Sequence, residues 1–231
     1  MDCQVLVIAD LHYINAAKHQ CNISKRECSK AKENIERIYR ETECIGIDAI
    51  ALVGDLVDNG NAENAEKDLI EIKKAIDAFN KPVIAICGNH DGKFSAFAEV
   101  FPCKDVNFVS GYQFVSFYDA YDEAGRAQRD MAKMRQLFQR LEADAPLIAL
   151  QHNPIYPDIE SNYPYDLINR EEVRAFYSQK NIMLSISGHY HPGTEVLEKD
   201  RVLYVTVGCL CEYPYTYGVL HLVGDKAWWQ N

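Results

Sequence analysis

The sequence predicts an α/β fold whose first strands run parallel. In the first 90 residues, three apolar runs with the length of buried strands alternate with two segments of helical periodicity. This alternation favours a parallel sheet, because parallel strands are joined by crossovers that are usually helices. No internal repeat or Pro/Gly/Ser-rich linker divides the 231 residues, so we expect a single domain over residues 1–231.

Three short strands and two amphipathic helices account for most of the first half of the chain. Leu69, Ile72 and Ile76 recur at the spacing of one helix face, and the preceding helical segment has the same pattern. Gly46 ends the first helix and Pro82 follows the second. We expect strands at residues 4–9, 47–53 and 83–87, helices at about 30–44 and 62–79, and a polar loop at 13–29.

The second half is expected to add further strands and helices. The alternating stretch at 112–117 predicts more exposed strands, whereas the polar residues 119–130 and the Tyr- and Pro-rich residues 155–168 predict loops. Asp200-Arg201 has the composition of a hairpin turn. We expect a short helix within 93–118, helices at about 130–143 and 170–179, and strands at 147–151, 182–187, 194–198, 202–207 and 217–223.

The composition narrows the class of protein. A net charge of −10 argues against binding to nucleic-acid polymers or anionic membranes, since no basic field collects phosphates. No signal peptide and no apolar stretch of about 18 residues is visible, so we expect a cytoplasmic protein without a membrane span. The eight scattered cysteines are expected to be free thiols. Cys209 and Cys211 are either a redox or metal pair or simply two residues at a strand end.

Side chains that commonly bind metals follow five of the predicted strands. Two pairs, Asp10-x-His12 and His189-x-His191, have i, i+2 spacing, which points both side chains the same way in an extended backbone. Glycines at 54, 88 and 188 would let the backbone turn sharply beside these residues. The ligand-type residues are Asp10, His12, Asp55, Asn89, His90, His152, His189 and His191.

The number and type of these side chains indicate two metal ions. Without His90, the set holds two carboxylates, one amide and four imidazoles, which exceeds what one zinc ion needs. Two ions sharing a carboxylate, roughly 3.5–4 Å apart, would clamp an in-line displacement at phosphorus. A nitrogen and oxygen set without cysteine favours manganese, iron or zinc over calcium.

Each motif alone has a simpler explanation. Asp10-x-His12 is compatible with turn chemistry, and Gly54-Asp55-x-x-Asp58 with the first turn of a helix. Gly188-His189-x-His191 is compatible with an exposed polar loop, and His152 with a surface turn. The metal site is favoured because the motifs appear in order after successive strands.

The ordered motifs resemble those of the calcineurin-like metallophosphoesterase superfamily, over residues 10–191. All five blocks are present: Asp10-x-His12, Gly54-Asp55-x-x-Asp58, Gly88-Asn89-His90-Asp91, His152 and Gly188-His189-x-His191. The resemblance implies a four-layer αββα sandwich of two mixed β-sheets flanked by helices. It also implies a dinuclear site at the strand ends, and so a metal-dependent phosphohydrolase.

The resemblance also implies a role for each residue. One ion would be bound by Asp10, His12 and His191, the other by Asn89, His152 and His189, and Asp55 would bridge them. His90 would act on the phosphoryl or leaving group, and an imidazole with an ordinary pKa near ~6.5 suits proton delivery. Asp58 and Asp91 would support the ligands. Attack by a hydroxide that bridges both ions is the expected chemistry.

Within the superfamily, the motifs are closest to small bacterial-type phosphodiesterases. Asn59 stands where protein Ser/Thr phosphatases carry an arginine, which disfavours that branch. We therefore expect a phosphodiesterase for a small nucleotide or glycerophosphodiester-type substrate. A phosphomonoesterase or nucleotide pyrophosphatase with the same site is one alternative, and a non-catalytic metal-binding scaffold is the other.

Two tyrosine-rich stretches are candidates for substrate contact. Tyrosine rings stack on a base or sugar and donate hydrogen bonds through their hydroxyls, although packing at a loop rim explains them as well. The candidate residues are Tyr156, Tyr163, Tyr165, Tyr213 and Tyr215. His221 lies in a strand pattern and is expected to be structural, and His19 lies outside all motifs.

Overall fold

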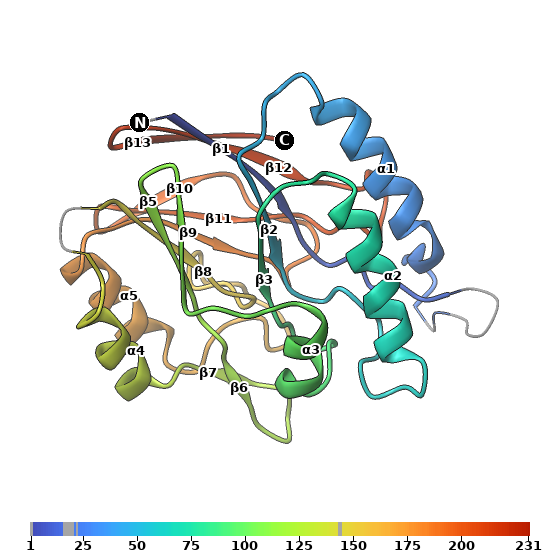
Figure 1. The fold of residues 1–231 in the computed structure, drawn as a ribbon. Helices are drawn as coiled ribbons and strands as arrows, with labels where there is room; N and C mark the ends of the chain where they lie inside the picture. Colours follow the sequence, from blue (N-terminus) through green and yellow to red (C-terminus); the bar gives the residue numbers. More distant parts are fainter. Residues whose placement is uncertain (1, 16–20, 22, 143–144) are drawn as a thin grey trace.

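Two mixed β-sheets lie face to face at the centre of the protein (Figure 1). The computed structural model describes residues 2–15, 21, 23–142 and 145–231, so the predicted loop at 13–29 is described only in part, and His19 lies outside the described residues. The first sheet has the order β13-β12-β1-β2-β3. Its strands are β1 (Asp2–Ile8), β2 (Ala49–Val53), β3 (Val83–Ile86), β12 (Gly218–Val223) and β13 (Lys226–Gln230).

The first three strands of the chain are parallel, as predicted. β1 pairs with β2 and β2 pairs with β3, both in parallel register. β12 then pairs antiparallel with β1, and β13 pairs antiparallel with β12 at the edge. β13 was not expected from the sequence. In this hairpin Trp229 packs against the backbone of Gly218 and joins the core, while the half-exposed Trp228 stacks on His221.

The second sheet has the order β10-β11-β9-β8-β5-β4. Its four central strands are parallel, and the edge strands β4 and β10 are antiparallel to their neighbours. Asp200 and Arg201 form the turn between β10 and β11 with positive φ angles, which confirms the predicted hairpin. The strands are β4 (Val106–Val109), β5 (Tyr112–Ser116), β8 (Leu147–Leu150), β9 (Ile182–Ser187), β10 (Leu197–Lys199) and β11 (Val202–Thr206).

Helices cover the outer face of each sheet. α1, α2 and α3 lie on the first sheet, and α4 and α5 lie on the second (Figure 1). The 3₁₀ turn Cys28–Lys30 leads into α1, and the two-residue strands β6 (Ala120–Tyr121) and β7 (Ala127–Gln128) precede α4. The helices are α1 (Ala31–Thr42), α2 (Ala65–Asp77), α3 (Phe94–Val100), α4 (Met131–Phe138) and α5 (Arg170–Gln179).

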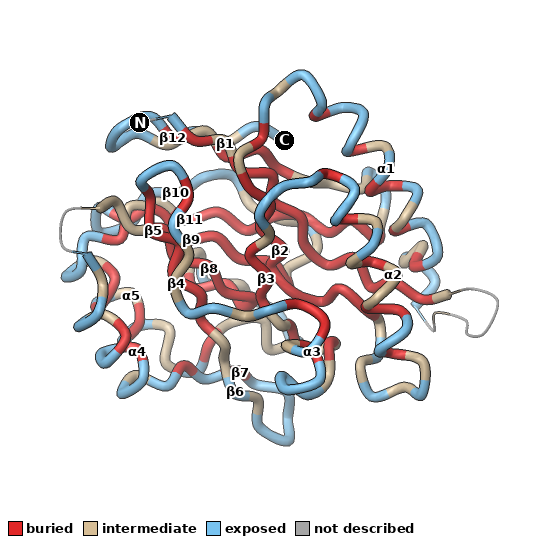
Figure 2. The backbone as a smooth tube through the Cα atoms, viewed as in Figure 1, coloured by how far each residue is buried: buried red, intermediate tan, exposed pale blue. Residues whose placement is uncertain are grey.

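Three apolar cores separate the four layers. Alternate residues of β1 serve two of them: Leu6 and Ile8 face the helices, while Val5 and Val7 face the second sheet. A third core lies between the second sheet and α4 and α5. The buried strands in the centre and the exposed outer surfaces of the helices are visible in Figure 2. The αββα sandwich implied by the resemblance is thus confirmed.

Two local predictions were wrong. β5 is buried along its whole length rather than more exposed, because it lies between β4 and β8 with a sheet on one side and helices on the other. The polar side chain of Gln113 is accommodated there by hydrogen bonds to the backbone of Glu142, at 2.8 and 2.9 Å. Residues 119–130 include the small β6–β7 ladder rather than loop alone.

All eight cysteines are free thiols, as predicted.

No helix within the described part of the chain is long and apolar enough to cross a membrane.

Candidate metal centre

Five strands from both sheets deliver the predicted ligand residues to one edge of the sandwich. β1, β2 and β3 of the first sheet and β8 and β9 of the second end there, and each is followed by its ligand-type side chain within a few residues. The carboxyl ends of parallel strands are where α/β sheets bind ligands. The structure brings all of the predicted metal-binding residues together at this edge.

Asp10, His12 and His191 form the first donor set. The Nε2 atoms of His12 and His191 lie 3.2 Å apart, and they lie 3.9 and 3.6 Å from Oδ1 of Asp10. The side chains of Asp10 and His12 are completely buried. These separations suit three ligands that bind one ion, since metal–nitrogen and metal–oxygen bonds of about 2.0–2.2 Å place ligand atoms about 3 Å apart.

Asn89, His152 and His189 form the second donor set, with Asp55 beside it. Nε2 of His152 lies 3.1 Å from Oδ1 of Asn89 and 3.3 Å from Oδ2 of Asp55. His189 offers a ligand atom within 4.8 Å of those of Asp55 and His152. His152 and His189 are almost fully buried.

Asp55 lies between the two sets. Its Oδ2 is 3.5 Å from Nε2 of His12 and 3.3 Å from Nε2 of His152, so one oxygen faces both sets. Its Oδ1 accepts a hydrogen bond of 2.8 Å from the backbone N–H of His90, which holds the carboxylate in this orientation. The geometry fits a shared carboxylate between two cations.

Two buried atoms support the fit to metal ions. Oδ1 of Asp10 and Nε2 of His189 are buried, and neither has a hydrogen-bond partner among the described residues. Buried polar atoms are rarely left without a partner, because each costs about 1–3 kcal/mol. One of these atoms belongs to each donor set, so a cation in each set would satisfy both.

The backbone around the donors is strained and closely packed. Asp10, His12, Asp55 and His189 all have φ between 44° and 67°, a left-handed region that non-glycine residues seldom adopt. Gly54 also has positive φ, as the predicted sharp turn requires. At Gly88 the reason for glycine is space, since a Cβ atom would collide with the Asp55 carboxylate.

The carboxylates and imidazoles of the site shift each other's pKa values. Burial alone would raise the pKa of Asp55, but His152 and His12 hold it well below its usual range. Burial opposes protonation of His152, yet the Asp55 carboxylate raises its pKa to about 10. Burial and the neighbouring His152 lower the pKa of His189 to about 3. Without cations, a protonated His152 therefore balances the charge of Asp55.

Three oxygen acceptors lie beside the Nδ1 atoms of donor-set imidazoles, on the side of each ring away from Nε2. Nδ1 of His12 lies 3.3 Å from Asp58, Nδ1 of His152 lies 2.8 Å from the carbonyl oxygen of Val53, and Nδ1 of His191 lies 2.7 Å from Glu212. An acceptor at Nδ1 fixes the tautomer that leaves Nε2 free for a metal.

Asp91 holds two of the ligand loops together. Burial and the nearby Asp55 raise the pKa of Asp91 to about 7, whereas hydrogen bonds from backbone N–H groups favour its ionised form.

His90 lies beside the first donor set, with its ring 4.5 Å from that of His12. Its Nδ1 is 2.6 Å from the carbonyl oxygen of Asp58, so Nδ1 donates and Nε2 remains available to a substrate.

Two of the five candidate tyrosines lie at the donor edge. The rings of Tyr163 and Tyr165 are 5.5 and 5.3 Å from that of His189. Tyr190 was not predicted, but its ring packs edge-on against Tyr165 at 5.2 Å. These rings form an aromatic wall beside the second donor set.

The other three candidate tyrosines make different contacts. Tyr156 packs on Tyr204 and beneath Arg174, in the layer between the second sheet and α5. Tyr215 donates its hydroxyl hydrogen bond to Glu27, and Tyr213 is 85% exposed. Their described contacts do not reach the donor side chains, so the structure places only Tyr163 and Tyr165 of the five candidates beside the donors.

Arg26 and Glu212 were missed by the sequence reasoning. Nη1 of Arg26 lies 3.0 Å from Asp58, which places a largely buried cation behind His12. Arg26 belongs to a polar loop and Glu212 follows Cys211, and neither segment carries a periodic pattern that would have identified them. Both residues reach the site only through the tertiary fold.

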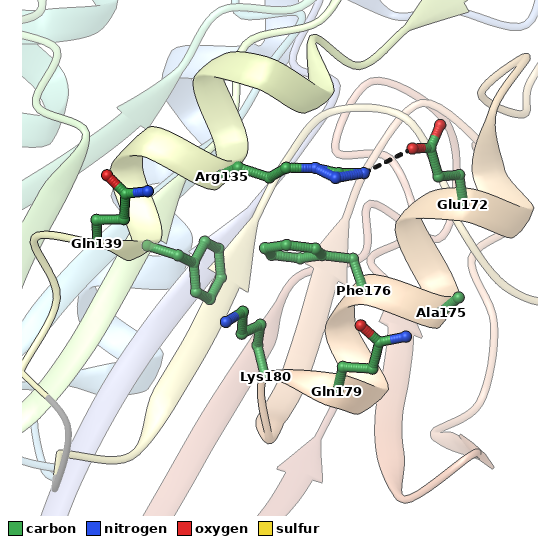
Figure 3. Close-up of a pocket in the computed structure, with 8 residues that line it drawn as sticks. Arg135, Gln139, Glu172, Ala175, Phe176, Gln179 and Lys180 are labelled. Carbon is green, nitrogen blue, oxygen red and sulfur yellow. Dashed lines mark hydrogen bonds and ion pairs between the residues drawn. The ribbon is translucent and has the colours of Figure 1, made fainter.

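A groove of about 500 Å³ lies elsewhere, between α4 and α5 (Figure 3). It is lined by side chains of α4 and α5, including Phe138 and Phe176, and by Lys180, which follows α5. The Arg135–Glu172 ion pair lies at its side. None of the strand-end donors contributes to it, so the chemistry belongs to the donor edge and not to this groove.

The comparisons with known proteins agree with this fold. The family model for calcineurin-like phosphoesterases matches residues 3–193. A dimetal phosphatase from Danio rerio is 13% identical, with a TM-score of 0.75 over 99% of this chain and 95% of that chain. The protein TT1561 of Thermus thermophilus is 18% identical, with a TM-score of 0.67 over 100% of this chain and 99% of that chain.

A phosphopantetheinyl hydrolase from Mycobacterium tuberculosis is 15% identical, with a TM-score of 0.55 over 90% of each chain. At these identities the structural likeness shows a shared fold. No protein with a curated description matches the sequence.

Proposed function

The chain belongs to the calcineurin-like phosphoesterase family, and on that premise we propose that it is a phosphodiesterase for a small nucleotide or glycerophosphodiester-type substrate. The cofactors would be two divalent ions, with manganese, iron or zinc suited to the donors. The observation that best supports this proposal is the position of Asp55, whose Oδ2 faces His12 of one donor set and His152 of the other.

The proposal assigns a separate role to each residue of the site. Asp10, His12 and His191 would hold one ion, and Asn89, His152 and His189 the other. When bound, two divalent ions would lower the pKa of a water molecule and neutralise phosphate oxygens. The backbone N–H of His90 donates to Oδ1 of Asp55, and the imidazoles of His12 and His152 lie beside its Oδ2. These contacts would hold Asp55 in the orientation that a shared carboxylate needs.

His90 is the residue proposed to move a proton. Its Nδ1 donates to the carbonyl oxygen of Asp58, so in the imidazolium form Nε2 carries the second proton, which it gives to the departing alkoxide. His90 is only partly buried, so a substrate can reach it. Proton delivery matters most when the leaving group is a poor one, such as an unactivated alcohol.

The aromatic wall supports a substrate with a planar or cyclic group. Tyr163 is 46% exposed and lies beside His189, where its ring can stack on the part of the substrate outside the metal centre. The acidic overall charge disfavours a long phosphate polymer. A small diester therefore fits the surroundings of the site better than a nucleic acid.

A phosphomonoesterase or nucleotide pyrophosphatase is the second candidate. Arg26 favours it, because a guanidinium close to the donors would attract the additional negative charge of a monoester or diphosphate. Arg26 is, however, already paired with Asp58, which reduces its field at the site. A non-catalytic metal-binding scaffold is the third candidate and predicts metal binding without turnover.

Substrate profiling tests the proposal. The protein would be loaded with Mn²⁺, Zn²⁺ or Fe²⁺ and supplied with cyclic nucleotides, glycerophosphodiesters, nucleotide diphosphate conjugates and monoesters. We expect the small diesters to have the highest kcat/KM. An Asp55→Asn preparation serves as the control for contaminating phosphatases and should be inactive. Preference for monoesters would replace the proposal with the second candidate, and two bound ions without any hydrolysis would replace it with the scaffold.

A further inference from the structure

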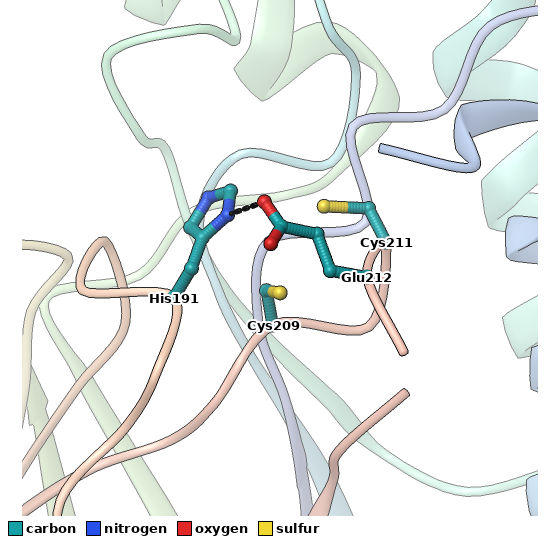
Figure 4. Close-up of side chains that lie close together, drawn as sticks. All are labelled: His191, Cys209, Cys211 and Glu212. Atoms are coloured by element: carbon teal, nitrogen blue, oxygen red, sulfur yellow. Dashed lines mark hydrogen bonds and ion pairs between the residues drawn. The ribbon is translucent and has the colours of Figure 1, made fainter. Parts of the chain in front are cut away.

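A second cluster of ligand-type side chains lies behind His191. Cys209, Cys211 and Glu212 come from the segment that follows β11, and Figure 4 shows their side chains gathered beside the His191 ring. One ligand atom from each of these four residues lies within 4.8 Å of the others. The proposed dinuclear centre uses none of the three residues from this segment.

The backbone fixes this cluster between two ligand loops. The N–H of Cys209 donates to the carbonyl oxygen of His191 at 3.0 Å, and the N–H of Cys211 donates to that of Asp10 at 3.2 Å. The cluster is thus held in place by main-chain hydrogen bonds.

Both thiols are shielded from water, since Cys209 is 4% and Cys211 is 1% exposed. Glu212 and His191 are partly buried and complete the set with an oxygen and a nitrogen. Two sulfur atoms with one nitrogen and one oxygen suit a tetrahedral zinc ion or a related soft divalent cation. Ligand atoms in such sites are about 3.3–3.8 Å apart, so binding requires only a small contraction of the cluster.

The two nitrogens of His191 face different groups. Nε2 lies 3.6 Å from Asp10 and 3.2 Å from Nε2 of His12, on the side of the dinuclear centre. Nδ1 lies 2.7 Å from Oε1 of Glu212, on the side of the thiols, as Figure 4 shows. A simpler reading is that Glu212 only orients His191 and the thiols only fill space. That explanation does not account for the position of both sulfur atoms, which lie within 4.8 Å of the imidazole nitrogen of His191.

We propose that Cys209, Cys211, Glu212 and Nδ1 of His191 form a separate binding site for one zinc-like divalent cation. Its ligands include two thiolates, which distinguishes it from the dinuclear centre. Binding releases three protons to the solvent, one from each thiol and the one on Nδ1 of His191 that otherwise donates to Glu212, so His191 becomes an imidazolate shared by the two sites. Because His191 contributes Nδ1 here and Nε2 to the other set, the new site would fix the orientation of a dinuclear-centre ligand.

Cadmium titration of the reduced full-length protein tests the proposal. Cd²⁺ is the probe, because its bonds to thiolates give a charge-transfer absorbance in the ultraviolet and nitrogen or oxygen ligands do not. We expect one equivalent of bound Cd²⁺ to produce this absorbance. In a C209S/C211S variant the absorbance and one equivalent of bound metal should be lost, while the remaining equivalents stay.

The matched control is a C21S/C28S variant. Cys21, Cys28 and Asp58 are another group whose ligand atoms lie within 4.8 Å, so a thiolate signal from that group must be separated from this one. The control should retain the absorbance. Persistence of the absorbance in C209S/C211S, its loss in C21S/C28S, or its absence from the unmodified protein would each overturn the proposal.

A second measurement needs no variant and therefore does not depend on the double variant folding. The ¹¹³Cd NMR shift of the unmodified protein separates a site with two sulfur ligands from sites with only nitrogen and oxygen ligands. We expect one resonance in the range of two-sulfur sites. Resonances only in the nitrogen and oxygen range would overturn the proposal. Glu212→Gln should weaken Cd²⁺ binding at this site by about 10-fold or more without removing the thiolate absorbance.

Discussion

Oδ1 of Asp91 accepts a hydrogen bond of 2.7 Å from the backbone N–H of Leu56. The same oxygen accepts from Val57 at 3.1 Å, and Oδ2 accepts from Gly88 at 2.8 Å. One buried carboxylate therefore ties the loop that carries Asp55 to the loop that carries Asn89. The distance between Asp55 and Asn89 therefore depends on a residue outside both donor sets.

We predict that Asp91→Asn destabilises the fold by about 1–3 kcal/mol, because the amide nitrogen cannot accept and leaves a buried N–H unpaired. Urea denaturation of the metal-free protein measures this change. The control is Asp48→Asn, since Asp48 accepts one backbone N–H, from Gln4, at the opposite end of β1. Equal losses in both variants would contradict the role assigned to Asp91.

Asp58 is predicted to tune the affinity of the first donor set for metal. Its Oδ1 lies 3.3 Å from Nδ1 of His12 and also pairs with Arg26. Asp58→Asn should lower metal affinity about 10- to 100-fold, as loss of an outer carboxylate behind a histidine ligand commonly does. Competition with a chelating dye measures the affinity. Asp105→Asn, which removes an exposed carboxylate paired with Arg140, should leave it unchanged.

His90 is predicted to affect turnover and not metal content. His90→Asn removes the imidazole proposed to protonate the leaving group, so hydrolysis of an alkyl phosphodiester should fall about 10²- to 10⁴-fold. An aryl diester, whose leaving group needs no proton, should lose much less. Metal analysis of both proteins should give the same stoichiometry. Equal losses for both esters would mean that His90 does not act as the acid.

The strand-end ligands could be predicted because each depends on a local pattern. An apolar run followed at once by a ligand-type residue identifies the carboxyl end of a buried strand, and such ends meet at one edge of a sheet. Asp55 and His152 are 97 residues apart in numbering, yet each is identified by the strand before it. The assignment of the donors to two separate ions came from the family resemblance and stays a prediction.

The remaining features depend on tertiary contacts that have no sequence pattern. Gln113 lies in an alternating stretch that predicts exposure, but the backbone of Glu142 satisfies its amide and allows burial. Arg26 and Glu212 lie in irregular segments, so no periodicity points to the donors that they support. Tyr156 belongs to the same Tyr- and Pro-rich stretch as Tyr163, and only packing on Tyr204 separates their roles.

Tyr165 is predicted to contribute to substrate binding. Its ring lies 5.3 Å from that of His189 and is braced by Tyr190. If it stacks on a base, Tyr165→Ala should raise KM for a nucleotide diester by about 10-fold, since such stacking contributes about 1–3 kcal/mol. KM for a glycerophosphodiester, which has no ring to stack, should change little. Tyr213→Ala removes an exposed tyrosine and is the control. A similar rise for both substrates would exclude stacking.

Glu71 on α2 is predicted to stabilise the loop after His12 in a pH-dependent way. Its carboxylate accepts hydrogen bonds from Tyr13 at 2.6 Å and from Lys32 at 2.7 Å, and these partners lower its pKa from 4.5 to about 2. Because the folded pKa is depressed, the contribution is complete above about pH 4.5 and disappears as pH falls toward 2.

Glu71→Gln should therefore lower Tm by about 2–4 °C at pH 7, which corresponds to about 1 kcal/mol for a partly exposed ion pair with an added hydrogen bond. The difference from the unmodified protein should shrink as the pH of the melt is lowered from 4.5 to 3. Asp77→Asn, which breaks an exposed pair with Lys73 on the same helix, should change Tm by less. A Tm difference that stays constant between pH 7 and pH 3 would show that the charge of Glu71 does not stabilise this loop.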